Sequence, residues 1–152
     1  MMFLLVFILH LGTCLCNTVS LYDDAANIVQ LTQSNFNDEV ILGYQAIWFV
    51  QFYNPENKVC VEFAPVWKRF SELLQGLLRT GVVNADQEKT LVQKYEITEF
   101  PTVKIFLNHE DKARDYTGLR RVKSMLHDVH MKTTELVHGR LTPADDVPRV
   151  EL

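Results

Sequence analysis

The chain has 152 residues, of which 47% are hydrophobic and 22% are charged, the composition of an ordinary globular protein with one domain and a sizeable core. Its formal net charge is −4 and its isoelectric point is near 5.7. Neither value favours a nucleic acid or an anionic membrane as a partner, so we expect neither.

Residues 1–20 differ in composition from the rest of the chain. An almost wholly apolar run is followed by small residues, the pattern of a signal peptide, and plausible cleavage sites follow Cys16 and Ser20. The alternative is an uncleaved membrane anchor, but the run is shorter than the roughly 20 residues that span a bilayer. Either cleavage removes Cys14 and Cys16 and leaves Cys60 as the one thiol of the mature chain. Such a cysteine is either buried and inert or free to form an intermolecular disulfide.

The first expected elements alternate between strand and helix. A short helix is predicted after Ser34, which would cap it, with inward-facing residues at Phe36, Val40 and Ile41. Residues 46–53 are nearly continuous in apolar and aromatic side chains and predict a strand buried on both faces. The next helix contains Pro65, which should kink it. Its inward face has helical spacing over Cys60, Phe63, Trp67, Phe70, Leu74 and Leu77.

The second half of the chain continues the alternation. The expected elements are a strand at 81–86, a helix at 88–95, a strand at 102–107, an edge strand at 114–116 and a helix at 120–138. The last helix would pack through Val122, Met125, Leu126, Val129, Leu136 and Val137. We therefore predict an α/β protein with one domain at 21–140, in which helices cover both faces of a central mixed sheet. Residues 141–152 are predicted to be a disordered tail.

The residues that carry the most information are Asn57-Lys58-Val59-Cys60, between the strand at 46–53 and the helix that follows it. A dithiol/disulfide couple needs two sulfurs within bonding reach, and this stretch supplies one.

Six blocks in order resemble the thioredoxin superfamily, and within it the protein disulfide isomerase family of the endoplasmic reticulum. The blocks are Val29 to Phe36, Phe52 to Pro55, Phe63 to Lys68, Val83 to Asp86, Tyr95 to Phe106 and Tyr116 to Arg120. The resemblance implies the thioredoxin fold.

The same resemblance implies a degenerate active site. Asn57 stands where the family has its nucleophilic cysteine, and Asn57 can instead cap the helix with its side chain. Val59 replaces the family's histidine, and Gln51 replaces a buried acidic residue that accepts a proton. Cys60 corresponds to the resolving cysteine. Its inward spacing predicts a shielded, weakly reactive thiol, and the alternative is a slow thiol that forms mixed disulfides.

Arg120 resembles the family arginine that approaches the resolving cysteine, and its alternative role is a solvated cation at a helix start. Pro101 matches the family's cis-proline beside the active site. With Tyr53, Pro55 and Phe100 it would border an apolar patch the size of a peptide. The alternative is a purely structural turn.

Three polar residues near the chain's end invite a metal-site interpretation. His127, Asp128 and His130 lie within one helical turn, but no further ligand is placed to complete a site. We therefore expect no metal and no cofactor.

The chain ends in Arg149-Val150-Glu151-Leu152, which resembles a degenerate retrieval signal. Together with the N-terminal segment it predicts the lumen of the endoplasmic reticulum, with secretion as the alternative.

The sequence therefore predicts an isomerase-like protein without its nucleophile, more a chaperone-type module than an enzyme. Its partners would be unfolded or nascent secretory proteins, or a specific partner protein. The alternatives are a residual thiol-disulfide isomerase that acts through Cys60 alone and a secreted interaction domain.

Overall fold

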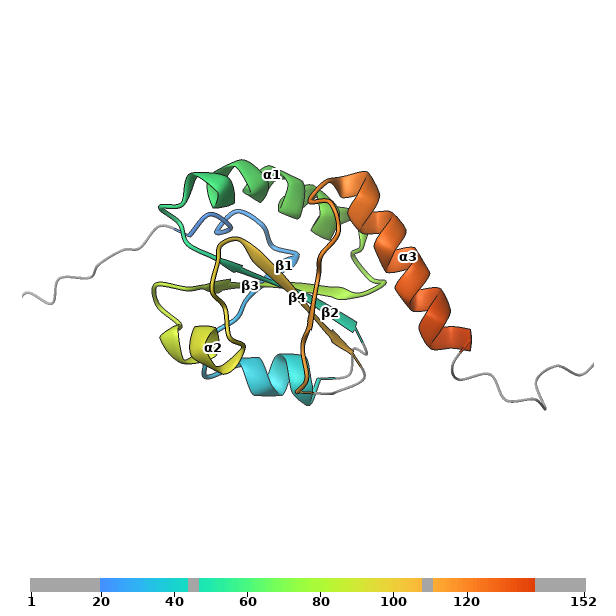
Figure 1. Ribbon diagram of the computed structural model, residues 1–152, viewed down its shortest axis with the longest axis horizontal. Coiled ribbons are helices and arrows are strands. Elements are labelled where there is room, and N and C mark those ends of the chain that lie inside the picture. Colours follow the sequence, from blue (N-terminus) through green and yellow to red (C-terminus); the bar gives the residue numbers. More distant parts are fainter. Residues whose placement is uncertain (1–19, 44–46, 108–110, 139–152) are drawn as a thin grey trace, which may run out of the picture.

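The computed structural model describes residues 20–43, 47–107 and 111–138, with side chains as far as residue 134. In these residues one mixed sheet has the strand order β1-β3-β2-β4-β5 (Figure 1). The strands are β1 (Ile28–Gln30), β2 (Ile47–Tyr53), β3 (Arg79–Asn84), β4 (Thr102–Leu107) and β5 (Arg114–Asp115).

Strand β2 occupies the centre of the sheet. It pairs in parallel with β3 and antiparallel with β4, so both of its edges are hydrogen-bonded. Helices cover both of its faces, which is why the strand carries an almost unbroken apolar run rather than an alternating one. Val50 and Phe52 are fully buried, and so is the polar Gln51 between them.

Two helical layers enclose the sheet (Figure 1). Helices α1 (Lys58–Leu73) and α3 (Val122–His138) lie over one face, where they enclose a core that contains Cys60, Trp67 and Met125. The π-helix η1 (Asn37–Ile41) and helix α2 (Lys89–Lys94) lie over the other, around Phe36 and Tyr95. The predicted α/β architecture, the order of its elements and the two-sided covering of the sheet are confirmed.

The cap predicted for the first helix is wrong. The Ser34 hydroxyl lies 2.8 Å from that of Thr32, and Asn35 Oδ1 accepts a hydrogen bond from the Thr32 backbone N–H at 2.8 Å. These bonds close a turn before the helix. The π-helix therefore begins only at Asn37, and Phe36 before it makes no side-chain cap.

The predicted inward face of the next helix extends too far, because it includes Leu77. Helix α1 ends at Leu73, and Leu77 is 76% exposed. Gly76 has φ +84°, a left-handed conformation that glycine adopts at little cost, and it turns the chain towards β3. After that turn Leu78, which is 6% exposed, enters the core in place of Leu77.

In the last helix, Met125 and Val129 are buried as expected, whereas Leu136 and Val137 lie outside the described side chains. The predictions for residues 1–19 and 139–152 also fall outside the described residues. Among the helices that are described, none combines the length and the apolar character needed to cross a bilayer.

Candidate functional site

The N-terminus of α1 is capped by the side chain of Asn57. This residue has extended backbone angles, and its Oδ1 accepts hydrogen bonds from the backbone N–H groups of Val59 at 2.8 Å and Cys60 at 3.4 Å. Two amides that would otherwise lack a partner are thereby satisfied. The predicted capping role of Asn57 is confirmed.

Cys60 lies in the first turn of α1 with its side chain turned into the protein. It is 0% exposed, so the predicted shielding is confirmed. Burial raises the pKa of the thiol, while a backbone hydrogen bond at Asn54 and the positive charge of Arg120 oppose this shift only in part. The thiol is therefore neutral at physiological pH, and the thiolate is the form that reacts. Arg120 itself is exposed, and it is near enough for its charge to act on the sulfur.

Gln51 lies on β2 in the same buried layer. Its Oε1 accepts a hydrogen bond from the Tyr22 hydroxyl at 2.6 Å, and its Nε2 has no hydrogen-bond partner among the described residues. Its register neighbours are Val82 on β3 and Val103 on β4, both apolar. A carboxylate here would face no cation from either strand, whereas the neutral amide avoids the cost of an unpaired buried charge.

Tyr22 completes this layer, and the sequence reasoning missed it. It is 1% exposed, its ring packs edge-on against Tyr53 at 5.1 Å, and burial raises its pKa well above the usual range. Ser20 adds a hydrogen bond between its Oγ and the Tyr53 hydroxyl at 3.0 Å. The segment before β1 therefore covers the inner side of the Cys60 layer. No local pattern signals this, since Tyr22 and Gln51 are 29 positions apart.

The peptide bond between Phe100 and Pro101 is cis, as predicted. Pro101 is buried, while Phe100 and Pro55 are half-buried at the surface. Tyr53 was predicted to border the same apolar patch, and that is wrong. It is 0% exposed because Tyr22 and Ser20 cover it.

Val59 is a further apolar side chain at the surface, and the predicted patch did not include it. It is 51% exposed in the first turn of α1, next in the chain to the buried Cys60. The sequence identified Val59 only as a lost histidine, yet its place just after a helix cap already indicated an exposed position.

His127, Asp128 and His130 were considered as metal ligands, and one of them, Asp128, is hydrogen-bonded to another residue. Asp128 Oδ2 accepts a hydrogen bond from the Tyr116 hydroxyl at 2.7 Å, which ties α3 to the segment after β5. Within the described ranges, no group of three or more His, Cys, Asp or Glu side chains is placed to hold a metal ion.

This arrangement limits the chemistry that the site can perform. Cys60 is the one cysteine among the described residues, and it is unpaired. Oxidation or reduction of a dithiol requires a second sulfur, and the position three residues earlier carries the Asn57 amide instead. The geometry therefore offers a buried thiol and a cis-proline surface.

Comparisons with known proteins agree with this geometry. The family model described as thioredoxin matches residues 27–131. The chain belongs to the thioredoxin family. Protein disulfide-isomerase A6 of Mus musculus is 36% identical over 121 residues, which cover 80% of this chain and 27% of that protein. The A6 homolog of Drosophila melanogaster is 34% identical over 134 residues, or 88% of this chain and 31% of that protein.

Solved structures give the same result. The J-Trx1 fragment of ERdj5 superposes with a TM-score of 0.67 at 31% identity, over 76% of this chain and 55% of that one. The Trx4 domain of ERdj5 has a TM-score of 0.65 at 25% identity, over 72% of this chain and 97% of that one. The chain is therefore a single thioredoxin-like domain related to protein disulfide isomerases, and it spans roughly a quarter to a third of the length of these curated relatives.

Proposed function

We propose that this protein is a disulfide-isomerase-like binding module without dithiol turnover, which holds unfolded secretory chains or a partner protein. The observation that carries the proposal is the N-terminus of α1. An asparagine caps the helix where the family's nucleophile would stand, and the remaining thiol, Cys60, is 0% exposed.

The family's active-site groups that are missing here include more than the nucleophilic sulfur. A thiolate at residue 57 would need a proton acceptor below it, and Gln51 cannot take up a proton at neutral pH. Val59 supplies no positive charge either. Restoring the sulfur alone through Asn57→Cys should therefore recover only part of the family's activity.

The surface proposed to hold a peptide needs neither a sulfur at residue 57 nor a proton acceptor at Gln51. The cis Phe100-Pro101 bond, the half-buried Phe100 and the exposed Val59 supply backbone groups and apolar area next to the buried thiol. An extended peptide can pair with such backbone groups while its side chains contact the apolar area.

Two assays on the same protein test the proposal. Insulin reduction should show no turnover in the wild type and partial turnover in Asn57→Cys. Suppression of aggregation of an unfolded client should be equal in the wild type and in Cys60→Ser, because binding does not use the thiol. Insulin reduction by the wild type at the rate of a two-cysteine isomerase would refute the proposal.

One observation favours a second candidate, a monothiol isomerase. The charge of Arg120 opposes the effect of burial on the pKa of Cys60, so a conformation in which this cation moves closer would activate the thiol. Trapping of mixed disulfides from cells, compared between the wild type and Cys60→Ser, separates the two functions. Abundant trapped complexes that vanish in Cys60→Ser would favour the monothiol enzyme.

The location that fits this function is the lumen of the endoplasmic reticulum, with residues 149–152 as the retrieval signal. Deletion of these residues should send the protein to the medium. An unchanged distribution would show that residues 149–152 are not a retrieval signal. Efficient secretion of the full chain would favour an extracellular interaction domain.

The contacts of Ser20 bear on the mature N-terminus. Its Oγ lies 3.0 Å from the Tyr53 hydroxyl and accepts hydrogen bonds from the Tyr22 N–H and from Gln30 Nε2, each at 3.1 Å. Cleavage after Ser20 would remove all three bonds, so we infer cleavage after Cys16. Mass spectrometry of the mature protein should find Asn17 as its first residue, and a chain that begins at Leu21 would contradict the inference.

A further inference from the structure

The residues before β1 form a short irregular segment, residues 20–26, which we call the strap. Figure 1 shows this segment running beside α1 before the chain enters the sheet at Ile28. Its backbone hydrogen bonds are local: the Ala25 N–H donates to the Tyr22 carbonyl, and the Ile28 N–H donates to the Ala25 carbonyl, each at 3.0 Å. Local turns of this kind do not join the strap to the sheet, so contacts that involve side chains have to hold it in place.

Tyr22 is the buried anchor of the strap. Of residues 20–26 it alone is buried, at 1% exposure. Its hydroxyl donates to Gln51 Oε1 at 2.6 Å, and its ring packs edge-on against Tyr53. A segment with few buried apolar contacts opens at a lower free-energy cost than the whole domain. With a single buried side chain, the strap should therefore open more readily than the core unfolds.

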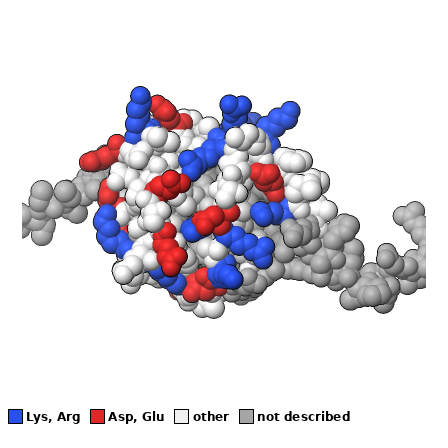
Figure 2. All heavy atoms as spheres, viewed as in Figure 1, with Lys and Arg blue, Asp and Glu red and all other residues white. Residues whose placement is uncertain are grey.

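A second attachment joins the strap to the middle of α1. Lys68 Nζ lies 2.6 Å from Asp24 Oδ1 and 5.9 Å from the centre of the Tyr22 ring. The Asp24 side chain is 75% exposed, so water competes for this ion pair. On the face seen in Figure 2, positive and negative side chains are interspersed, so no broad field of one sign adds to the attraction. This attachment is therefore weak.

The strap lies over the layer that contains the thiol. Tyr22, Tyr53 and Cys60 belong to one core cluster, and Cys60 is 0% exposed. A reagent could reach the sulfur past the strap or through the first turn of α1, which Asn57 caps. The helix route breaks backbone hydrogen bonds together with the cap. Lifting the strap breaks side-chain contacts and leaves the helix and the sheet intact, so it is the less costly route.

A buried donor without a partner favours the same route. Gln51 is 0% exposed, and its Nε2 has no hydrogen-bond partner among the described residues. Such a group raises the free energy of the closed state, because it has lost water and gained no partner. When Tyr22 lifts, water can reach the Gln51 amide, and this gain offsets part of the cost of opening.

From these contacts together, we propose that the strap is a gate for Cys60, hinged at Asn27, and that the thiol becomes accessible when the strap lifts while α1 and the sheet stay folded. Asn27 fits a hinge because it adjoins β1 and its Nδ2 donates to Ser71 Oγ at 2.6 Å, which pins that end of the strap to α1. The gate does not require peptide binding, so it stands apart from the proposed function.

Alkylation of Cys60 at increasing urea concentrations tests the gate. The mature chain is labelled with iodoacetamide, a small neutral reagent, and each rate is divided by that of the denatured chain at the same pH. When opening and closing are fast relative to labelling, this ratio reports the population of the open state. The dependence of an opening on urea grows with the surface that it exposes. Below the unfolding transition we expect less than about a quarter of the slope of global unfolding, and an equal slope would refute the gate.

Two variants weaken the strap from different sides. Tyr22→Phe removes the hydroxyl that donates to Gln51 and should speed native labelling roughly five- to thirtyfold. Lys68→Met removes the ion pair with Asp24 and the cation beside the Tyr22 ring, and should speed labelling at least about threefold. Lys68 follows Cys60 in α1 by about 12 Å along the helix axis, so its effect reports the strap and not the surroundings of the thiol. If Lys68→Met labels no faster than the wild type, the strap is not the gate.

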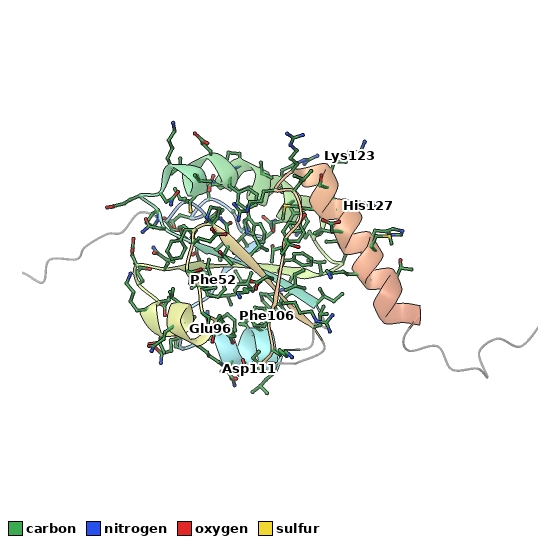
Figure 3. The ribbon with its side chains drawn as sticks, viewed as in Figure 1. Phe52, Glu96, Phe106, Asp111, Lys123 and His127 are labelled. Atoms are coloured by element: carbon green, nitrogen blue, oxygen red, sulfur yellow. The ribbon has the colours of Figure 1, made fainter. Side chains whose placement is uncertain are left out.

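Two controls test the other routes to the thiol. Asn57→Ala loosens the first turn of α1. Leu91→Ala loosens the core around Phe52 and Phe106, which lies on the face of the sheet that η1 and α2 cover (Figure 3). Both variants should lower the urea midpoint, yet label within about twofold of the wild type below the transition. If Asn57→Ala labels as fast as Tyr22→Phe, the thiol is reached through the helix, and if Leu91→Ala does so, it is reached by global unfolding. Either result would overturn the gate.

Discussion

The layer around Cys60 and the edge groove, the hollow lined by residues 96–99, 102–104 and 115–120, are built in opposite ways. Around Cys60 the polar groups are buried or half-buried, and most are paired within the protein: Asn57 with backbone amides, and Tyr22 with Gln51. In the edge groove, Glu96 and Glu99 are exposed and unpaired by any described residue. The thiol of Cys60 is therefore closed to solvent, while the carboxylates of Glu96 and Glu99 are open to it.

The largest effect should come from removing Tyr22. Tyr22→Ala deletes a ring that is 1% exposed, its edge-on contact with Tyr53 and its hydrogen bond to Gln51. We expect the free energy of unfolding to fall by about 4 kcal/mol, as for other large aromatic side chains in a core. Urea denaturation measures the change, and the thiol of Cys60 should become faster to alkylate in the same variant.

Tyr22→Phe serves as the matched control. It keeps the ring and removes only the hydroxyl that donates to Gln51 Oε1, so the loss should be about 1–2 kcal/mol. Equal losses in the two variants would show that the hydrogen bond, and not the packing, accounts for the contribution of Tyr22.

A smaller effect is expected at the helix cap. Asn57→Ala removes the acceptor for the N–H groups of Val59 and Cys60 and should cost about 1 kcal/mol. Asn57→Asp keeps an acceptor at a helix N-terminus, where negative charge is favourable, so its stability should match or exceed that of the wild type. If Asn57→Ala is as stable as the wild type, the amide does not act as a cap.

The smallest effect on stability should come from the edge groove. Glu99→Gln removes an exposed charge with no partner among the described residues, so the urea midpoint should not change measurably. A clear loss of stability would mean that Glu99 is engaged by the protein, and the contrast between a closed and an open region would fail.

Most of the fold could be predicted from the sequence, because its elements follow local rules. The apolar run at residues 46–53 and the inward spacing after Cys60 gave β2 and α1 within a few residues, and Asn57 was recognised as the cap of α1. Prediction failed where two local structures compete for the same residues, such as a turn and a helix. At Ser34 a turn formed in place of the cap, and at Leu77 a left-handed glycine had already ended the helix.

The candidate site was predictable only in part. The positions of Cys60 and Pro101 followed from the resemblance, but the burial of Tyr53 depends on Tyr22 and Ser20, which reach it from before the first strand. The unpaired carboxylates of the edge groove were not found either, because whether a surface charge has a partner depends on tertiary structure. Periodicity reports which face of an element is buried and gives no information on such distant contacts.

Alkylation of Cys60 in the mature chain measures whether this thiol is shielded and unreactive in the folded protein. Burial raises the pKa of this thiol above its unfolded value, so the stability it contributes is complete below the unfolded pKa and is lost as the pH rises through the folded pKa. At pH 7 we predict native labelling at least about a hundredfold slower than labelling in denaturant, with acceleration only at alkaline pH. Rapid labelling of the native protein at pH 7 would show an accessible, activated thiol and would contradict the account.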